Sequence, residues 1–430
     1  MKIWQKENST VTQQIDAFTV GRDREFDMLL APYDVQGSIA HVTMLHHVGL
    51  LNDEDYSKIK PALEQLHAEI LSGSFAIDNS CEDIHSQIEW MLIQRIGDAG
   101  KKIHSGRSRN DQVAVDIKLY LKAELQEVKD LTLSLFNKLL SLSEQHKGKL
   151  MPGYTHMQVA MPSSFGLWFA AYAESLVDDM DMLMTASRMV DKNPLGSGAG
   201  YGSSFALDRQ LTTDLLGFSS MHYNSIYAQM SRGKTEKIVA HAISGIAATL
   251  SRFSMDVCLY NGQNFGFVSF PSHMTTGSSI MPHKKNPDVF ELVRGKCNRL
   301  QSIPNELALL MNNLPSGYHR EMQLTKEILF PGIEALKSCL SIVQMMLHEV
   351  VVHDNILEDE RYKYIFTVEQ LNDMVNSGVA FRDAYKQVGI EVENGNFSYH
   401  GKQLHHIHAG SIGNLCNEEI RKEMSRVIEG

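Results

Sequence analysis

The chain has 430 residues, 43% of them hydrophobic, which is enough for a large core divided over two or three structural regions. Its 40 Lys and Arg stand against 51 Asp and Glu, and the net charge of −11 argues against nucleic acid or an anionic membrane as the main partner. Five cysteines, far apart and never in a CxxC spacing, argue against a disulfide framework or a zinc knuckle and fit reduced thiols in a cytoplasm.

The N-terminal segment gives no sign of export. Its first ten residues, MKIWQKENST, contain no apolar stretch of the kind that forms a signal peptide. The two longest segments without Asp, Glu, Lys or Arg are residues 150–173 and 257–283, and two prolines interrupt each of them, which disfavours a membrane span. We therefore expect a cytoplasmic protein.

Helix is the main element that the sequence predicts, because apolar residues recur at spacings of three and four and only 11 prolines are present. Between Gly106 and Gly148 there is neither Gly nor Pro, and an apolar stripe from Val113 to Leu139 predicts a helix of about 50 to 60 Å at about 1.5 Å per residue. A helix of that length normally needs neighbours along its whole stripe, as in a bundle or a coiled assembly.

Further long helices are predicted in the second part of the chain, and few strands are expected. The helices are expected over residues 163–192, 234–260, 288–314 and about 332–353. Polar breaker segments separate them, at residues 104–109, 151–162, 193–204, 265–287 and 314–325. The pattern predicts an all-α fold with a central bundle, in which the chemistry lies at such loops.

The first breaker, HSGRSRNDQ, places two arginines where the longest helix begins. Arg109, with Asn110 beside it as a further donor, is suited to bidentate recognition of a carboxylate. The alternative is an elaborate N-cap in which Asp111 favours the helix dipole, and the two interpretations are compatible.

The second breaker, PGYTHMQ, places His156 in a turn between two long helices. A histidine there can reach a cleft, and an unperturbed pKa of about 6.5 suits proton transfer at neutral pH. The alternative is a histidine that only satisfies local hydrogen bonds.

Two other features indicate structure rather than chemistry. Residues 196–202, GSGAGYG, fit GxGxxG in neither register and follow no predicted strand, so a tight, closely packed turn is favoured over dinucleotide binding. The tract His405-His406-Ile407-His408 has no accompanying acids in its segment, so no functional metal is expected there.

The loop TGSSIMPHKKNP, residues 276–287, combines Gly, Ser, two prolines and two lysines just before a predicted helix. Backbone amides and hydroxyls beside Lys284 and Asn286 could hold a carboxylate, and the helix N-terminus adds a favourable dipole. The alternative is a capped loop with solvated lysines. A further segment, residues 318–326, YHREMQLTK, collects a phenol, an amide and cations, and a solvated connection is the alternative there.

In this order, these segments resemble the fumarase/aspartase superfamily, and GRSRNDQ together with GSSIMPHKKNP is similar to the argininosuccinate lyase family. The resemblance begins at FTVGRD, residues 18–23, and reaches VAFR, residues 379–382. It implies a cofactor-free and metal-free enzyme that reversibly eliminates fumarate from the small molecule argininosuccinate and releases arginine, in arginine biosynthesis. It also implies three regions, at residues 1–108, 109–352 and 353–430, and a homotetramer whose active sites combine loops from different subunits.

The resemblance also implies residue roles. Ser278 looks like the loop serine that removes the proton beside a substrate carboxylate, and His156 like the partner acid or base, although the two roles are exchangeable. Lys284 and Asn286 would hold the carboxylate that takes up charge, and Glu291 would orient His156. The remaining matches are to positions that bind the substrate in the family: Ser38, Arg109, Asn110, Thr155, Tyr318, Gln323 and Lys326.

The sequence departs from the family pattern at three places. His283 stands where the family usually has Gln, AQMSRGK at residues 228–234 where it has an Asp-rich segment, and Leu324-Thr325 where it has acids. Loss of these acids could alter recognition of the cationic arginine end. The alternatives are another fumarate-releasing lyase, of adenylosuccinate, aspartate or N-acylated argininosuccinate type, and a non-enzymatic structural tetramer of the same fold.

Overall fold

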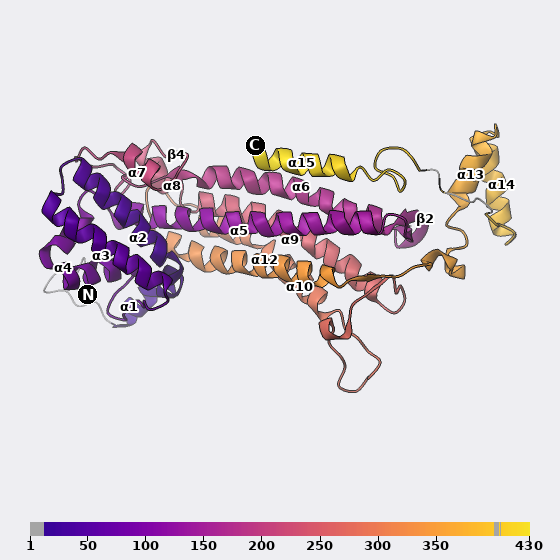
Figure 1. Ribbon diagram of the computed structural model, residues 1–430, viewed down its shortest axis with the longest axis horizontal. Coiled ribbons are helices and arrows are strands. Elements are labelled where there is room, and N and C mark those ends of the chain that lie inside the picture. Colours follow the sequence, from indigo (N-terminus) through magenta and orange to yellow (C-terminus); the bar gives the residue numbers. More distant parts are fainter. Residues whose placement is uncertain (1–12, 400–403, 405) are drawn as a thin grey trace. The chain divides into compact units, whose positions relative to one another are not determined.

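The computed structural model describes residues 13–399, 404 and 406–430 (Figure 1). The chain forms two compact units: unit 1 consists of residues up to 128, 182–244 and 299–336, and unit 2 of residues 129–181, 245–298 and 337–430. Four long helices each contribute residues to both units, and they are α5 (Arg109–Gln145), α6 (Phe165–Val190), α9 (Lys234–Asn261) and α12 (Thr325–His348).

The helix α5 confirms the expectation of one unusually long rod. It has 37 residues, so its length is about 55 Å at about 1.5 Å per residue. At its start Asp111 accepts hydrogen bonds from the backbone of Ser108 at 2.8 Å and, through its second oxygen, from Gly196 and Gly198 at 3.0 and 2.9 Å. The predicted N-cap is therefore confirmed, and the same carboxylate fixes the glycine-rich turn, whose glycines 196, 198, 200 and 202 all have positive φ.

Over its described residues, unit 1 contains helices, their connecting loops and one short parallel strand pair. Its other elements are α1 (Gln13–Val20), α2 (Asp23–His47), α3 (Asp53–Leu71), α4 (Ile84–Ile96), η1 (Gly97–His104), β3 (Lys192–Asn193), α7 (Arg209–Leu215), β4 (Ser220–Met221), α8 (Ser225–Met230), α11 (Ile303–Leu310) and η3 (Arg320–Leu324). Asn52 and Asp83 cap α3 and α4 by accepting from backbone amides in the first turns. Buried Leu and Ile side chains of α2, α3 and α4 form the core between these helices.

Unit 2 contains the ends of the four long helices and two antiparallel strand pairs. Its other elements are β1 (Leu150–Thr155), β2 (Gln158–Ser164), β5 (Val268–Ser269), η2 (Ser272–Met274), α10 (Asp288–Leu300, whose last two residues fall in unit 1), β6 (Val351–Val352), η4 (Ile356–Glu358), η5 (Glu360–Tyr362), α13 (Thr367–Asn376), α14 (Phe381–Glu393) and α15 (Asn417–Glu429). Hydrogen bonds join α6 to α9, as from Trp168 to Asp256 at 3.1 Å, and α12 to α5, from Gln344 to Ser134 at 2.5 Å.

Three predictions of local structure were wrong in detail. Residues 151–162 are not an irregular breaker, because they form most of the β1–β2 hairpin. The single helix expected over residues 288–314 is two helices, since Pro304 lacks an amide hydrogen and therefore begins a new helix, α11. The helix expected from residue 332 begins at Thr325 instead and accommodates Pro331 in its interior.

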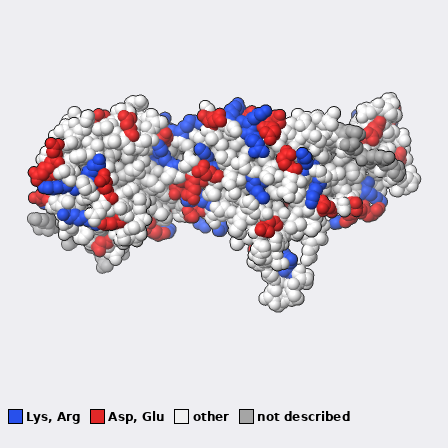
Figure 2. Space-filling view, in the orientation of Figure 1, with Lys and Arg blue, Asp and Glu red and all other residues white. Residues whose placement is uncertain are grey.

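Two helical stretches, residues 234–261 and 320–348, are long and apolar enough to cross a membrane. In their most apolar windows 56% and 44% of the residues are buried inside the protein, as in the core helices of a bundle. On the face shown in Figure 2, Lys and Arg side chains are interspersed with Asp and Glu in small groups.

Candidate active site

A cavity of about 210 Å³ in unit 1 is lined mainly by charged side chains of both signs. The carboxylates are Asp23 and Asp27 of α2 together with Glu82 and Asp83 before α4. The cations are Arg109, Arg232, Arg320 and Lys326. The cavity therefore offers partners for carboxylates and for cationic groups of one ligand.

Arg109 and Asn110, the pair that the sequence singled out, both line this cavity from the first turn of α5. The Arg109 guanidinium donates to Ser86 Oγ at 2.9 Å and lies 2.9 Å from Asp83 Oδ2, and its side chain is 25% exposed. Because Asp83 also caps α4, the guanidinium is anchored to the backbone and keeps its exposed part for the cavity.

Lys326 forms the most deeply buried charge cluster of the cavity. Its ammonium group, 3% exposed, lies between Asp27, at 2.6 Å, and Asp23. Burial raises the pKa of Asp23 to about 6 against the attraction of Lys326. Burial alone would lower the pKa of Lys326, but the attraction of Asp27 and Asp23 outweighs it and raises that pKa. Lys326 is therefore charged at neutral pH.

The segment 318–326 lines the cavity. In the sequence by itself, a solvated connection was the alternative interpretation of this segment. Tyr318, Arg320 and Gln323 all line the cavity. Arg320 donates to Glu82 Oε1 at 2.8 Å, and the Gln323 amide donates to the backbone oxygens of Thr19 and Val20 at 3.2 and 3.1 Å. These contacts join three segments that are distant in the sequence.

Ser38 does not open into this cavity. It is completely buried, its hydroxyl donates to Asp34 at 3.3 Å, and it accepts from Arg107 at 3.0 Å. The cavity instead includes His85, which was not predicted from the sequence as a site residue. The other charged cavity residues that were missed are Asp23, Asp27, Glu82, Asp83, Arg232 and Arg320. Only the charged character of their segments could have indicated them.

The predicted catalytic histidine, His156, lies in unit 2 on the turn of the β1–β2 hairpin. His156 and Met157 are the two central residues of this turn, and both have positive φ, 52° and 60°. A type I′ hairpin turn has positive φ at both central residues, a conformation that is uncommon for residues other than Gly, although Asn, Asp and His adopt it more often than the rest. The turn presents His156 to solvent, and Thr155, the last residue of β1, precedes it.

The loop with the predicted catalytic serine also belongs to unit 2 and is closed at its base. The Asn286 backbone amide donates to Thr276 O at 2.9 Å, and its side chain donates to Gly277 O at 3.3 Å. Ser278 Oγ accepts from the backbone of Met281 at 3.2 Å, while Lys284 is exposed. Figure 1 shows the loop extending from the bundle before α10. Glu291 lies in the first turn of α10, directly after this loop.

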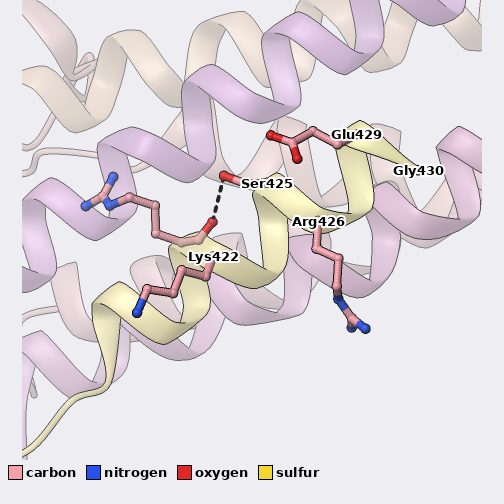
Figure 3. Close-up of a pocket in the computed structure, with 6 residues that line it drawn as sticks. Lys422, Ser425, Arg426, Glu429 and Gly430 are labelled. Atoms are coloured by element: carbon pink, nitrogen blue, oxygen red, sulfur yellow. Dashed lines mark hydrogen bonds between the residues drawn. The ribbon is translucent and has the colours of Figure 1, made fainter.

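Two other candidate features of unit 2 are a hollow beside α15 and the histidine tract. A hollow of about 460 Å³ is lined by residues of α15 and by Gly430 directly after it. Figure 3 shows these residues, with Ser425 donating to the backbone oxygen of Arg421. In the histidine tract, His405 lies outside the described residues. His406 pairs at 2.9 Å with Glu369, an acid from outside the segment of the tract.

Comparisons with known proteins agree with the helical fold. Residues 10–302 match the model of the lyase family. Argininosuccinate lyases of Bacteroides thetaiotaomicron and Parabacteroides distasonis are 54% and 56% identical to the chain, over 100% and 99% of it and 96% and 95% of their own lengths. The Thermotoga neapolitana argininosuccinate lyase is 39% identical over 90% of the chain and 97% of its own length.

Solved structures extend the similarity to the fold. EDDS lyase in complex with formate matches with a TM-score of 0.75 at 21% identity, covering 98% of this chain and 90% of that one. A Mesorhizobium fumarate lyase matches with a TM-score of 0.71 at 15% identity, covering 99% and 93%. The fold is thus that of the fumarate lyases. Because the chain is 54% and 56% identical to two argininosuccinate lyases over 100% and 99% of its length, it belongs to the argininosuccinate lyase family.

Proposed function

We propose that the protein catalyses the reversible elimination of fumarate from argininosuccinate, with arginine as the second product, in the cytoplasm and as a step of arginine biosynthesis. The observation that carries the proposal is the mixed charge of the unit 1 cavity. Argininosuccinate has three carboxylates, an ammonium group and a guanidinium. Arg109, Arg320 and Lys326 suit its carboxylates, and Glu82 and Asp83 suit its cationic groups.

The chemistry needs a base and an acid. Ser278 would take the proton from the carbon beside a carboxylate, the electron pair would form the carbon–carbon double bond of fumarate, and the bond from carbon to the guanidino nitrogen would break. His156 would return a proton to that nitrogen, and the two roles are exchangeable between these residues. Lys284 and Asn286 would stabilise the negative charge on the carboxylate, with each well-aimed donor worth about 3 to 4 kcal/mol. Glu291 would orient His156.

The residues proposed to bind the substrate and those proposed to transfer protons belong to different units of the chain. The cavity lies in unit 1, and the hairpin turn and the loop lie in unit 2. We propose that a homotetramer assembles each active site from several subunits, each with regions at residues 1–108, 109–352 and 353–430. Thr155 and Ser38 would join the substrate-binding set, Ser38 through Asp34 rather than by direct contact.

The test is to give argininosuccinate to the purified protein and follow fumarate by ultraviolet absorbance while arginine is quantified. Fumarate and arginine in equal amounts support the proposal, and prolonged treatment with a chelator should leave the rate unchanged. No fumarate from a folded protein would refute it, and adenylosuccinate and N-acylated argininosuccinate would then be tried. The full-length identity to argininosuccinate lyases favours the unmodified substrate and an enzyme over a structural protein.

A further inference from the structure

A second layer of buried polar residues lies beneath the cavity in unit 1. On α5, Arg109 and Val113 line the cavity, whereas Gln112 and Asp116 are 3% and 0% exposed. The motif at the start of α5 therefore supplies both a surface for the ligand and a buried layer behind it. The proposed mechanism uses the first of these and leaves the second without a role.

The centre of this layer is an imidazole between two carboxylates. His85 Nδ1 lies 2.8 Å from Asp34 Oδ2 and 3.7 Å from Asp116 Oδ2. Gln112 donates to Asp34 at 2.8 Å, and Ser38 donates to the same Asp34 oxygen at 3.3 Å, so the Asp34 carboxylate is held in one orientation. His85 also lines the cavity, and with Nδ1 turned to Asp34 its other nitrogen, Nε2, remains for a ligand.

The surrounding charges decide the protonation of His85. Burial lowers its pKa, but Asp34 above all, with Asp83 and Asp116, outweighs burial and raises the pKa to about 9. The Asp34 carboxyl has a lowered pKa because the attraction of His85 overcomes its burial. Burial and the nearby Asp34 charge raise the pKa of Asp116 well above its usual value. His85 is therefore an imidazolium at neutral pH and lies opposite an ionised Asp34.

Two basic neighbours also face this layer. Arg107 donates to Ser38, and its charge acts on both Asp34 and Asp116. The His104 pKa is lowered to about 4, mainly by burial and then by Arg107 and His85, so His104 is neutral where His85 is charged. Among the facing histidines, His85 is thus the one that carries charge in the physiological pH range.

We propose that His85 is a cationic binding residue that donates from Nε2 to a carboxylate of the ligand, and that Asp34 is the positioning residue that fixes its tautomer, direction and charge. The inference rests on the proposed function, because it assigns His85 to the dicarboxylate part of that substrate. It also gives Ser38 and Gln112 a role, since both hold Asp34.

The same three side chains are a conceivable divalent-cation site, since ligand atoms of Asp34, His85 and Asp116 lie within 4.8 Å of one another and both Asp116 oxygens are buried without a hydrogen-bond partner. The hydrogen-bond distance from His85 Nδ1 to Asp34 and the positive charge of Arg107 favour the imidazolium instead. A metal is therefore one of the outcomes that the experiment has to distinguish.

The test is calorimetric titration of the whole protein with fumarate at pH 7.5, in two buffers of different ionisation enthalpy, which yields both affinity and proton uptake. In Asp34→Asn the imidazole is neutral before binding, so fumarate should bind about tenfold more weakly and take up about one proton more per site than in the wild type. His85→Gln should weaken binding about tenfold without that extra uptake. Asp116→Asn should lose less affinity than Asp34→Asn. As a matched control, Asp53→Asn removes the acid of the exposed His46 pair and should change nothing.

The wild type supplies an independent measurement that does not depend on a variant that folds poorly. Its affinity for fumarate should be constant from pH 7 to 8 and fall as the pH rises through about 9. Unchanged fumarate affinity in folded His85→Gln would overturn the inference. A metal site would also overturn the inference. It would appear as a loss of fumarate affinity on chelator treatment that zinc or cobalt restores, with Asp116→Asn as harmful as Asp34→Asn.

Failure of the proposed function gives a different result. If the wild type converts argininosuccinate while His85→Gln binds fumarate normally, only the role of His85 is refuted. If the wild type neither converts argininosuccinate nor binds fumarate, the proposed function is refuted and this inference with it.

Discussion

Arg232 donates from Nε to Glu236 Oε1 at 3.1 Å, and the two side chains are only 4% and 1% exposed. Glu236 also accepts from the Gly233 backbone at 2.7 Å and from Thr325 Oγ1 at 3.4 Å. From the sequence, we identified Thr325 and the segment that contains Gly233 as departures from the family pattern, at positions where acids were expected. Glu236 is the buried counter-charge of Arg232, which lines the cavity.

Replacing Glu236 by Gln should destabilise the protein by about 3 to 5 kcal/mol, because the buried Arg232 guanidinium loses its counter-charge. The denaturant midpoint measures this loss. The Michaelis constant for the substrate should rise as well, since Arg232 lines the cavity. Glu25→Gln is the control, because Glu25 pairs with Arg22 on the surface and its loss should leave the midpoint unchanged. Equal midpoints for the two variants would show that Glu236 is not the partner Arg232 needs.

The sequence predicted what depends on local pattern. The absence of Gly and Pro between residues 106 and 148 predicted α5, and clustered arginine and amide side chains identified Arg109 and Asn110 as candidates for carboxylate recognition. The sequence did not predict the pairing of Lys326 with Asp23 and Asp27, because α2 and α12 are about 300 residues apart and only the tertiary fold brings them together.

His85 shows a second limit of sequence reasoning. A single histidine on an amphipathic helix has no distinguishing pattern, and its importance arises from Asp34 and Asp116 on two other helices. Ser38 shows the converse. The family match placed it among the binding residues, but helix packing buries its hydroxyl one layer below the cavity.

Replacing Gly233 by Ala should lower the free energy of unfolding by about 1 to 3 kcal/mol. Gly233 has φ of +73°, and an added Cβ would lie 1.8 Å from Met311 Sδ, so both backbone strain and a displaced side chain contribute. Gly217→Ala separates the two effects, because Gly217 has φ of +66° and nothing within 4 Å of its Cβ position. If both variants lose the same stability, the contact with Met311 contributes nothing.

Replacing Ser278 by Ala should reduce turnover about 10²- to 10⁴-fold, the usual contribution of a positioned base, while fumarate affinity and assembly stay normal. Steady-state kinetics with argininosuccinate and size measurement in solution check this. Ser279→Ala is the matched control in the same loop. Near-normal turnover by Ser278→Ala would remove Ser278 from the mechanism and leave His156 as the candidate base.

Replacing Asp179 by Asn should stabilise the protein at neutral pH. Asp179 lies in α6, accepts from Thr249 Oγ1 at 2.6 Å, and has a pKa that burial raises to about 6. A carboxyl with a folded pKa above its unfolded value contributes stability that is complete below about pH 4 and is lost as the pH rises through 6. The variant escapes this loss, so at pH 7 it should be more stable by about 1 to 3 kcal/mol, and at pH 4 the advantage should vanish. Denaturant unfolding at both pH values measures the difference, with Asp181→Asn, an exposed position on the same helix, as the control. An advantage of equal size at both pH values would mean that it does not come from the ionisation of Asp179.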